Sequence, residues 1–183
     1  MPEKVTTIYE SPHDDQAKEF FAEFGHVALA NIYEPTLGAD AAKYAYQRTR
    51  LHTNNRINGQ TGDIWYSMGQ LSNPIARVIT AAIQNAELLE AQDIFLRENK
   101  VRAQVIDHAP GAQGAWHKDF GMIVTTLQGS SQFEIDGEGK TIDANYHVTP
   151  GTIVVMDPSR KLLHRGVAGA NVSRTGLAIE QAR

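Results

Sequence analysis

The sequence predicts a mainly β fold, a small antiparallel sandwich or jelly roll buttressed by helices on one sheet. Apolar residues recur at helical spacing in the first half of the chain, whereas short β-like runs alternate with turn residues after about residue 100. A length of 183 residues gives room for about one domain. We therefore expect a single domain, 1–183, in which 1–100 form helical support and a lid region and 101–183 form the β core.

Three helices are expected, at 14–24, about 38–51, and 74 to about 91. Ser11 or Asp14 is a candidate N-cap for the first helix, and Gly25 is its stop signal. Pro74 begins the third helix, because proline is favoured in the first turn.

The β elements are mostly in the second half. Candidate strands there are 101–107, 122–127, 132–136, 140–148, 152–156, 162–167 and 174–179. Turn formers such as Pro110-Gly111 and Pro150-Gly151 separate them. A further short strand is expected at 26–32, and 53–70, rich in Asn, Gly and Gln, predicts a loop or hairpin.

Composition excludes several function classes. Without cysteine the chain has no disulfide, Fe–S cluster, thiolate zinc site or cysteine nucleophile. Seventeen basic against 21 acidic residues leave a net charge of −4, which disfavours nucleic acid as the main ligand. No signal-peptide-length or membrane-length apolar run is present. We expect a cytoplasmic protein with a small-molecule substrate and no nucleic-acid or membrane partner; the oligomeric state is left open.

One H-x-D motif is a candidate metal site. In a strand, residues i and i+2 project to one side, so His117 and Asp119 can present a nitrogen and an oxygen to one metal. His117 follows a β run and a turn and precedes an apolar strand, as expected of a ligand at a barrel mouth, although a surface pair is the alternative. A second match, His13-x-Asp15, lies ahead of a helix, where capping is the simpler role.

Two further residues extend this set. His164 lies in an apolar strand, where a histidine is more often a hydrogen-bonded core residue. Two histidines and one carboxylate nevertheless make the facial triad of non-haem Fe(II) oxygenases. Arg174 opens the last strand; if buried it needs an anionic partner such as a dicarboxylate, and if exposed it can pair with Glu180 or Asp157.

The order His117-x-Asp119, a β run, His164 and then Arg174 resembles the Fe(II)- and 2-oxoglutarate-dependent dioxygenase superfamily. Within it, the run Trp116-His117-Lys118-Asp119 is most similar to the phytanoyl-CoA dioxygenase-like branch. The likeness covers residues 101–179 and implies a cupin-like double-stranded β-helix.

The resemblance also implies a chemistry. His117, Asp119 and His164 would hold Fe(II) as the catalytic metal ligands, and Arg174 would bind the cosubstrate 2-oxoglutarate. With O2, such an enzyme hydroxylates an unactivated C–H bond of a small molecule and releases succinate and CO2. Desaturation, ring closure and epoxidation use the same triad, whereas the carboxylate of Asp119 disfavours halogenation.

The chain departs from the superfamily pattern at one position. The usual R-x-S pattern would place a hydroxyl two residues after Arg174, but Gly176 stands there. A second contact to the distal carboxylate is therefore expected from Thr126, Gln104 or Thr175.

The chain is short for this group, which implies an open site or a lid built from 53–70. Other side chains are candidates for substrate contact because they lie on that segment or beside the ligands, with ordinary packing as the alternative. They are Trp65, Tyr66, Arg102, Trp116 and Phe120. The remaining histidines have no partner at ligand spacing and are expected to be structural: His26, His52, His108 and His147.

Two other classes of function stay open. A cupin-type isomerase or hydrolase could use the same three ligands with Zn²⁺, Mn²⁺ or Ni²⁺, although the cupin H-x-H pattern followed by Glu is absent. The chain could also be a non-catalytic β-sandwich binding module in which the three residues never meet.

Overall fold

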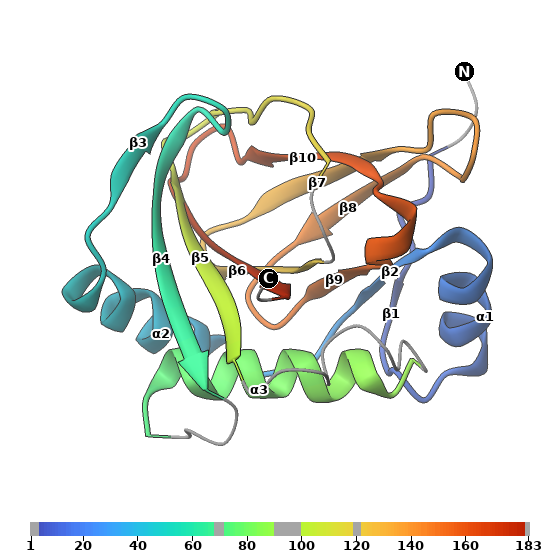
Figure 1. Cartoon of the computed structure of the whole chain (residues 1–183), viewed down its shortest axis with the longest axis horizontal. Coiled ribbons are helices and arrows are strands. Elements are labelled where there is room, and N and C mark those ends of the chain that lie inside the picture. The colour runs from blue at the N-terminus through green and yellow to red at the C-terminus, as the bar shows by residue number, and fades with distance from the viewer. Residues whose placement is uncertain (1–3, 68–71, 90–99, 119–121, 182–183) are drawn as a thin grey trace.

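The computed structural model describes residues 4–67, 72–89, 100–118 and 122–181 (Figure 1). The strands are β1 (Ile8–Tyr9), β2 (His26–Leu29), β3 (His52–Asn54), β4 (Gly59–Ser67), β5 (Lys100–His108), β6 (Met122–Gln128), β7 (Ser131–Asp136), β8 (Ala144–Val148), β9 (Ile153–Met156), β10 (Leu163–Ala168) and β11 (Arg174–Gln181). The helices are α1 (Asp15–Phe24), α2 (Pro35–Arg48), α3 (Pro74–Glu87) and the 3-10 turn η1 (Pro158–Arg160).

The strands form a large and a small sheet. The large sheet has the order β1-β2-β9-β6-β11-β5-β4-β3, and the small sheet has the order β10-β7-β8. All pairs are antiparallel except β1 with β2. The predicted mainly β fold is therefore confirmed, and both halves of the chain contribute strands to the large sheet.

The two faces of the large sheet have different partners. Leu177 and Ile179 of β11 belong to a core cluster shared with all three helices, whereas Ala178 belongs to a second cluster shared with the small sheet. Because side chains alternate along a strand, Arg174 of β11 and His108 of β5 lie on the same face as Ala178. The candidate site thus lies between the sheets and away from the helices.

The segment 53–70 was predicted to be a loop or hairpin, and the hairpin is confirmed. Its described part, to residue 67, is mostly the β3–β4 hairpin, and β4 pairs with β5 from Gln60 to Ser67 at the side of the large sheet. Most of the described part of this segment therefore belongs to the edge of the large sheet. Among the described residues of this segment, Ile57 in the turn between β3 and β4 lines the pocket described below.

Helix ends agree closely with the sequence signals. The side chain of Asp14 accepts a hydrogen bond from the Gln16 amide, which caps α1, and Gly25 ends the helix at a left-handed φ of 76°. Pro74 begins α3 behind the N-cap Asn73. Helix α2 begins at Pro35, a few residues earlier than expected.

Among the described residues, no helix is both long enough and apolar enough to cross a bilayer.

Candidate metal and anion site

His117 and His164 lie next to each other although they come from different parts of the chain. The amide of His117 donates to the carbonyl oxygen of His164 at 3.0 Å, and the amide of His164 donates back at 2.9 Å. This bridge joins the segment before β6 to β10. The two ring centroids are 4.5 Å apart. The fold therefore brings together the two imidazoles that the sequence singled out.

Backbone carbonyls define the tautomer of both rings. Nδ1 of His117 is 2.7 Å from the Ala115 oxygen, and Nδ1 of His164 is 2.9 Å from the Leu162 oxygen. Because a carbonyl only accepts, each Nδ1 carries the proton, and in a neutral ring Nε2 then carries the lone pair. Phe133 stacks on His164 at 5.4 Å and restrains its plane. A neutral imidazole oriented through Nδ1 is the form that binds metals through Nε2.

The third predicted ligand, Asp119, lies outside the described residues, as does Phe120. Among the residues that are described, no group of three or more His, Asp or Glu side chains is arranged to hold a metal ion. The donor set that the structure describes is thus two imidazoles, which suit iron, zinc, copper and nickel.

Arg174 is buried beside this pair. Its side chain is 1% exposed, and within the described chain its Nε and Nη2 atoms have no hydrogen-bond partner. Burial lowers the pKa of Arg174 to about 10, so the guanidinium still carries its charge at neutral pH. A buried cation without a counter-charge is unfavourable, and an anionic ligand would supply that charge.

The glycine at position 176 has a steric explanation. A Cβ there would lie 2.8 Å from Nη2 and 2.9 Å from Cζ of Arg174, closer than real contacts allow. A Cβ at Gly166 of β10 would lie 2.7 Å from Nη1. The guanidinium therefore passes directly over two glycines, and a serine at position 176 would collide with it.

His108 is a residue that sequence reasoning assigned to a structural role. It pairs with Arg174 in the β5–β11 register and is 2% exposed. Its Nε2 donates to the Ile57 oxygen at 2.8 Å, while its Nδ1 has no partner within the described chain. Burial and the charge of Arg174 lower the pKa of His108 to about 4, so the ring is neutral at pH 7. His108 lies beside Arg174 because of the register between β5 and β11, which the sequence does not show.

These groups share one pocket between the sheets, of about 40 Å³. That volume holds a few water molecules at most, so a dicarboxylate requires lining side chains to turn aside. The lining residues are Ile57, Gln104, Ile106, His108, Gly114, His117, Val124, Phe133, His164, Gly166, Arg174 and Ala178.

The three candidates for a second carboxylate contact differ in position. Gln104 lines the pocket, and its amide donates to Asp63 at 3.3 Å. The hydroxyl of Thr126 is instead hydrogen-bonded to that of Ser131 at 3.1 Å. The hydroxyl of Thr175 bonds Tyr46 of α2 at 2.8 Å, on the opposite face of β11, which excludes it from this pocket.

Of the candidate substrate contacts, Arg102 and Trp116 have described side chains, and neither lines the pocket. Arg102 binds Asp63 at 3.0 Å and Glu180 at 3.1 Å. Trp116 is 38% exposed, and the Arg165 guanidinium lies 4.6 Å from its ring centroid. Trp65 and Tyr66 belong to β4, and their side chains are not described.

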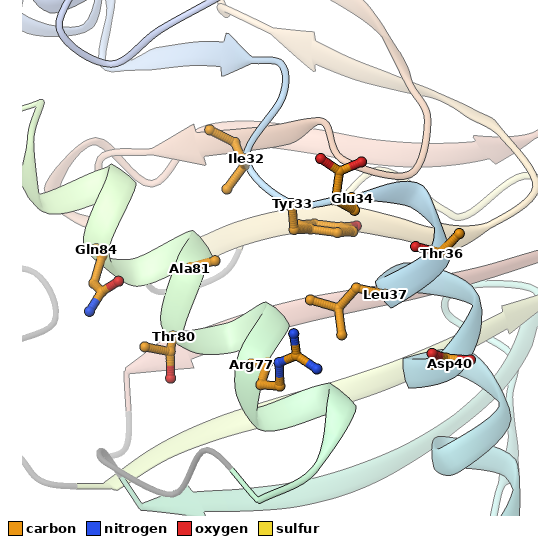
Figure 2. A pocket seen from close by; sticks show the side chains of 10 residues that line it. All are labelled: Ile32, Tyr33, Glu34, Thr36, Leu37, Asp40, Arg77, Thr80, Ala81 and Gln84. Atoms are coloured by element: carbon orange, nitrogen blue, oxygen red, sulfur yellow. The ribbon is translucent and has the colours of Figure 1, made fainter.

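A larger hollow, of about 580 Å³, lies on the helical side (Figure 2). Glu34, Leu37 and Asp40 line it from the start of α2, and Arg77 lines it from α3. Within the described chain, no buried polar atom without a partner belongs to its lining. It therefore lacks the feature that distinguishes the pocket at Arg174.

Comparisons with known proteins place the fold. No family model matches the chain, and no curated protein matches it in sequence. A prolyl-4-hydroxylase from Pseudomonas putida superposes with a TM-score of 0.64 at 19% identity, over 92% of this chain and 98% of its own.

Two further solved structures give similar values. The non-heme alpha-ketoglutarate-dependent carbocyclase SnoK of nogalamycin biosynthesis has a TM-score of 0.66 at 12% identity, over 95% of this chain and 87% of its own. The dioxygenase for auxin oxidation 1 from Arabidopsis thaliana, solved with 2-oxoglutarate, has a TM-score of 0.67 at 11% identity, over 96% and 92%. At these identities the likeness shows the fold alone: this chain has the fold of those oxygenases.

Proposed function

We propose that this protein is an Fe(II)- and 2-oxoglutarate-dependent oxygenase that hydroxylates an unactivated C–H bond of a small molecule. The observation that carries the proposal is one pocket lined by two Nδ1-protonated imidazoles, His117 and His164, and by the buried guanidinium of Arg174. The fold shared with solved oxygenases supports it. On the same ground we propose that the two-sheet core is a double-stranded β-helix.

Each residue has a stated role in this proposal. Nε2 of His117 and Nε2 of His164 bind the metal, with Asp119 as the third ligand. Bound Fe(II) would supply the activation of O2 that couples conversion of 2-oxoglutarate into succinate and CO2 to oxidation of the substrate. Arg174 binds the distal carboxylate and orients the cosubstrate. The apolar Val124, Phe133 and Ala178 keep bulk water away from this space.

The finer assignment and the cellular setting are also proposals. The run Trp116-His117-Lys118-Asp119 supports the phytanoyl-CoA dioxygenase-like branch. We propose a small-molecule substrate and no nucleic-acid or membrane partner in the cytoplasm, as the net charge of −4 and the apolar pattern favour.

An anaerobic binding experiment tests the function. Fe(II) plus 2-oxoglutarate should give the visible charge-transfer absorption of a chelated 2-oxo acid. The band should vanish in His117→Ala but persist in His147→Ala, a matched control on the exposed side of β8. Arg174→Ala should weaken 2-oxoglutarate binding more than metal binding.

Other outcomes would favour the rival functions. Folded protein that binds metal yet stays colourless with 2-oxoglutarate, and forms no succinate, would favour a cupin-type isomerase or hydrolase. Protein that binds no metal at all would favour a binding module. Screening candidate substrates by succinate formation would then identify the substrate of an active oxygenase.

A further inference from the structure

Three glycines make room for His108 and Arg174. A Cβ at Gly59 of β4 would lie 2.4 Å from the Asp107 carbonyl oxygen and 2.5 Å from Cδ2 of His108, and those at Gly166 and Gly176 would lie 2.7 and 2.8 Å from guanidinium nitrogens. The Gly166 position is also 3.9 Å from Cε1 of His108, so both side chains border the same glycine. Each of three strands thus has a glycine, which lacks a side chain, where these two polar groups lie.

The pair has donors and an acceptor that the described residues do not use. Nε and Nη2 of Arg174 are buried donors without an acceptor, and Nδ1 of His108 is a buried atom without a partner. Buried polar atoms in native proteins are nearly always hydrogen-bonded, so several unpaired ones in one pocket are groups that a bound ligand can satisfy. The guanidinium requires that this ligand be an anion.

The protonation state of His108 determines whether its Nδ1 repels an anion or donates a hydrogen bond to it. Its Nε2 already donates to the Ile57 oxygen, so in the neutral ring Nδ1 holds a lone pair that repels a carboxylate oxygen. Protonation turns Nδ1 into a donor without breaking the bond to Ile57. The anion bound by Arg174 then stabilises the imidazolium.

We propose that His108 is the second group that binds the distal carboxylate, and that it takes up one proton from solvent when a dicarboxylate binds beside Arg174. The inference deepens the proposed function and rests on it for the identity of the diacid, 2-oxoglutarate. His108 then makes the carboxylate contact that a serine at position 176 would otherwise make. The affinity of the site for the dicarboxylate depends on pH as a result.

Several other charged or titratable groups surround His108. Arg174 faces it from β11, and His117 and His164 line the same pocket. Asp107 is its neighbour on β5, but the Asp107 carboxylate lies on the other face and accepts from Tyr46 at 2.7 Å. The experiment must therefore separate His108 from the two candidate metal ligands. Saturating Zn²⁺ holds bound imidazoles in the neutral form.

The test is calorimetric titration of the full chain with glutarate in the presence of Zn²⁺. Glutarate has both carboxylates but no 2-oxo group, so its binding reports the anion site rather than chelation. Measurement in two buffers of different ionisation enthalpy counts protons. At pH 6 we expect uptake of about one proton per glutarate, and binding about tenfold weaker at pH 7.

Two amides form a matched pair of variants. In His108→Gln the amide can still donate to Ile57 but offers nothing at the Nδ1 position, so glutarate should bind at least tenfold more weakly at pH 6, without proton uptake. In His108→Asn a permanent N–H donor stands near that position, so binding should persist and become independent of pH. Thermal melts without ligand check that each variant is folded.

Each result bears on the inference or on the proposed function separately. Wild-type binding without proton uptake, together with unchanged affinity in folded His108→Gln, would overturn the role of His108 even if the Fe(II) charge-transfer band appears. Absence of glutarate binding would overturn it as well. Proton-linked glutarate binding without the band would support His108 and contradict the oxygenase.

Discussion

Two buried histidines on the same face of the large sheet have opposite surroundings. His26 is 0% exposed and His108 is 2% exposed, and burial is the main cause that lowers the pKa of each to about 4. His26 bonds Tyr146 of the small sheet through Nδ1 at 2.8 Å and the Ile142 oxygen through Nε2 at 3.0 Å. His108 has only its Nε2 bond to Ile57 within the described chain.

The difference separates a closed end of the inter-sheet space from the end that holds the candidate site. Around His26 the fold completes every ring hydrogen bond, which is the ordinary solution for a core histidine. Around Arg174, Nε and Nη2 have no hydrogen-bond partner within the described chain, and glycines lie beside the guanidinium. Burial therefore does not distinguish His26 from His108. The number of ring nitrogens that are hydrogen-bonded within the described chain does: two in His26 and one in His108.

The largest expected effect is a loss of stability in acid that both histidines share. Each binds a proton near pH 6.5 when unfolded but only near pH 4 when folded, so the unfolded state binds more protons between these values and stability falls as pH drops through them. At pH 5 the loss relative to pH 7.5 is about 2 kcal/mol for each, or about 4 kcal/mol together. Urea unfolding at the two pH values measures it.

Addition of glutarate should separate the contributions of the two histidines to this loss of stability. Glutarate at pH 5 should restore the share that belongs to His108, because the bound anion stabilises its imidazolium, and should leave the share of His26 unchanged. A free energy of unfolding that stays flat from pH 7.5 to 5 would contradict the buried neutral state of both rings.

The next effect concerns the glycine that accommodates the guanidinium. Gly176→Ser restores the hydroxyl of the R-x-S pattern, but its Cβ would lie 2.8 Å from Nη2 of Arg174. We expect a stability loss of about 3 kcal/mol from overpacking and at least tenfold weaker 2-oxoglutarate binding, measured by unfolding and calorimetry.

A second glycine of the same pocket is the control. At Gly114 a Cβ would meet nothing closer than 3.4 Å, so Gly114→Ala should change the affinity less than twofold. Wild-type affinity in Gly176→Ser would show that the guanidinium can move aside without cost.

Local signals explain why so much of the fold was predictable. The Asp14 cap, the Gly25 stop and the first-turn Pro74 are short-range features, and the structure confirms all three. Turn formers divide the second half into strands close to the expected ranges. By contrast, 53–70 is an Asn- and Gly-rich stretch whose sheet pairing depends on β5, a partner far along the chain.

Register explains what could not be predicted at the site. Whether Thr175 or Arg174 enters the pocket depends on which face of β11 meets the small sheet, and alternation within β11 alone does not decide this. The pairing of His108 with Arg174 likewise needs the alignment of two strands. His117 and His164 were recognisable because ligand chemistry, not register, singled them out.

A deletion at the closed end tests the other side of the comparison. Tyr146→Phe removes the hydroxyl that donates to Nδ1 of His26 and leaves that nitrogen buried without its partner. We expect a stability loss of about 2 kcal/mol in urea unfolding and no change in 2-oxoglutarate affinity. A change in affinity as large as that of His108→Gln would mean that the two ends are not independent.

The smallest expected effect concerns a hydroxyl that is already hydrogen-bonded within the fold, at the end that holds the candidate site. Thr126 lies on the inner face of β6 beside Gly176, yet its hydroxyl is paired with that of Ser131 at 3.1 Å, so it has no need of a ligand. Thr126→Val keeps the shape and removes this bond, which should cost about 1 kcal/mol of stability. Affinity for 2-oxoglutarate should change less than twofold by calorimetry. A tenfold loss of affinity in this variant would mean that the Thr126 hydroxyl leaves Ser131 and binds the ligand. Thr126 would then be the second carboxylate contact, and His108 would not have that role.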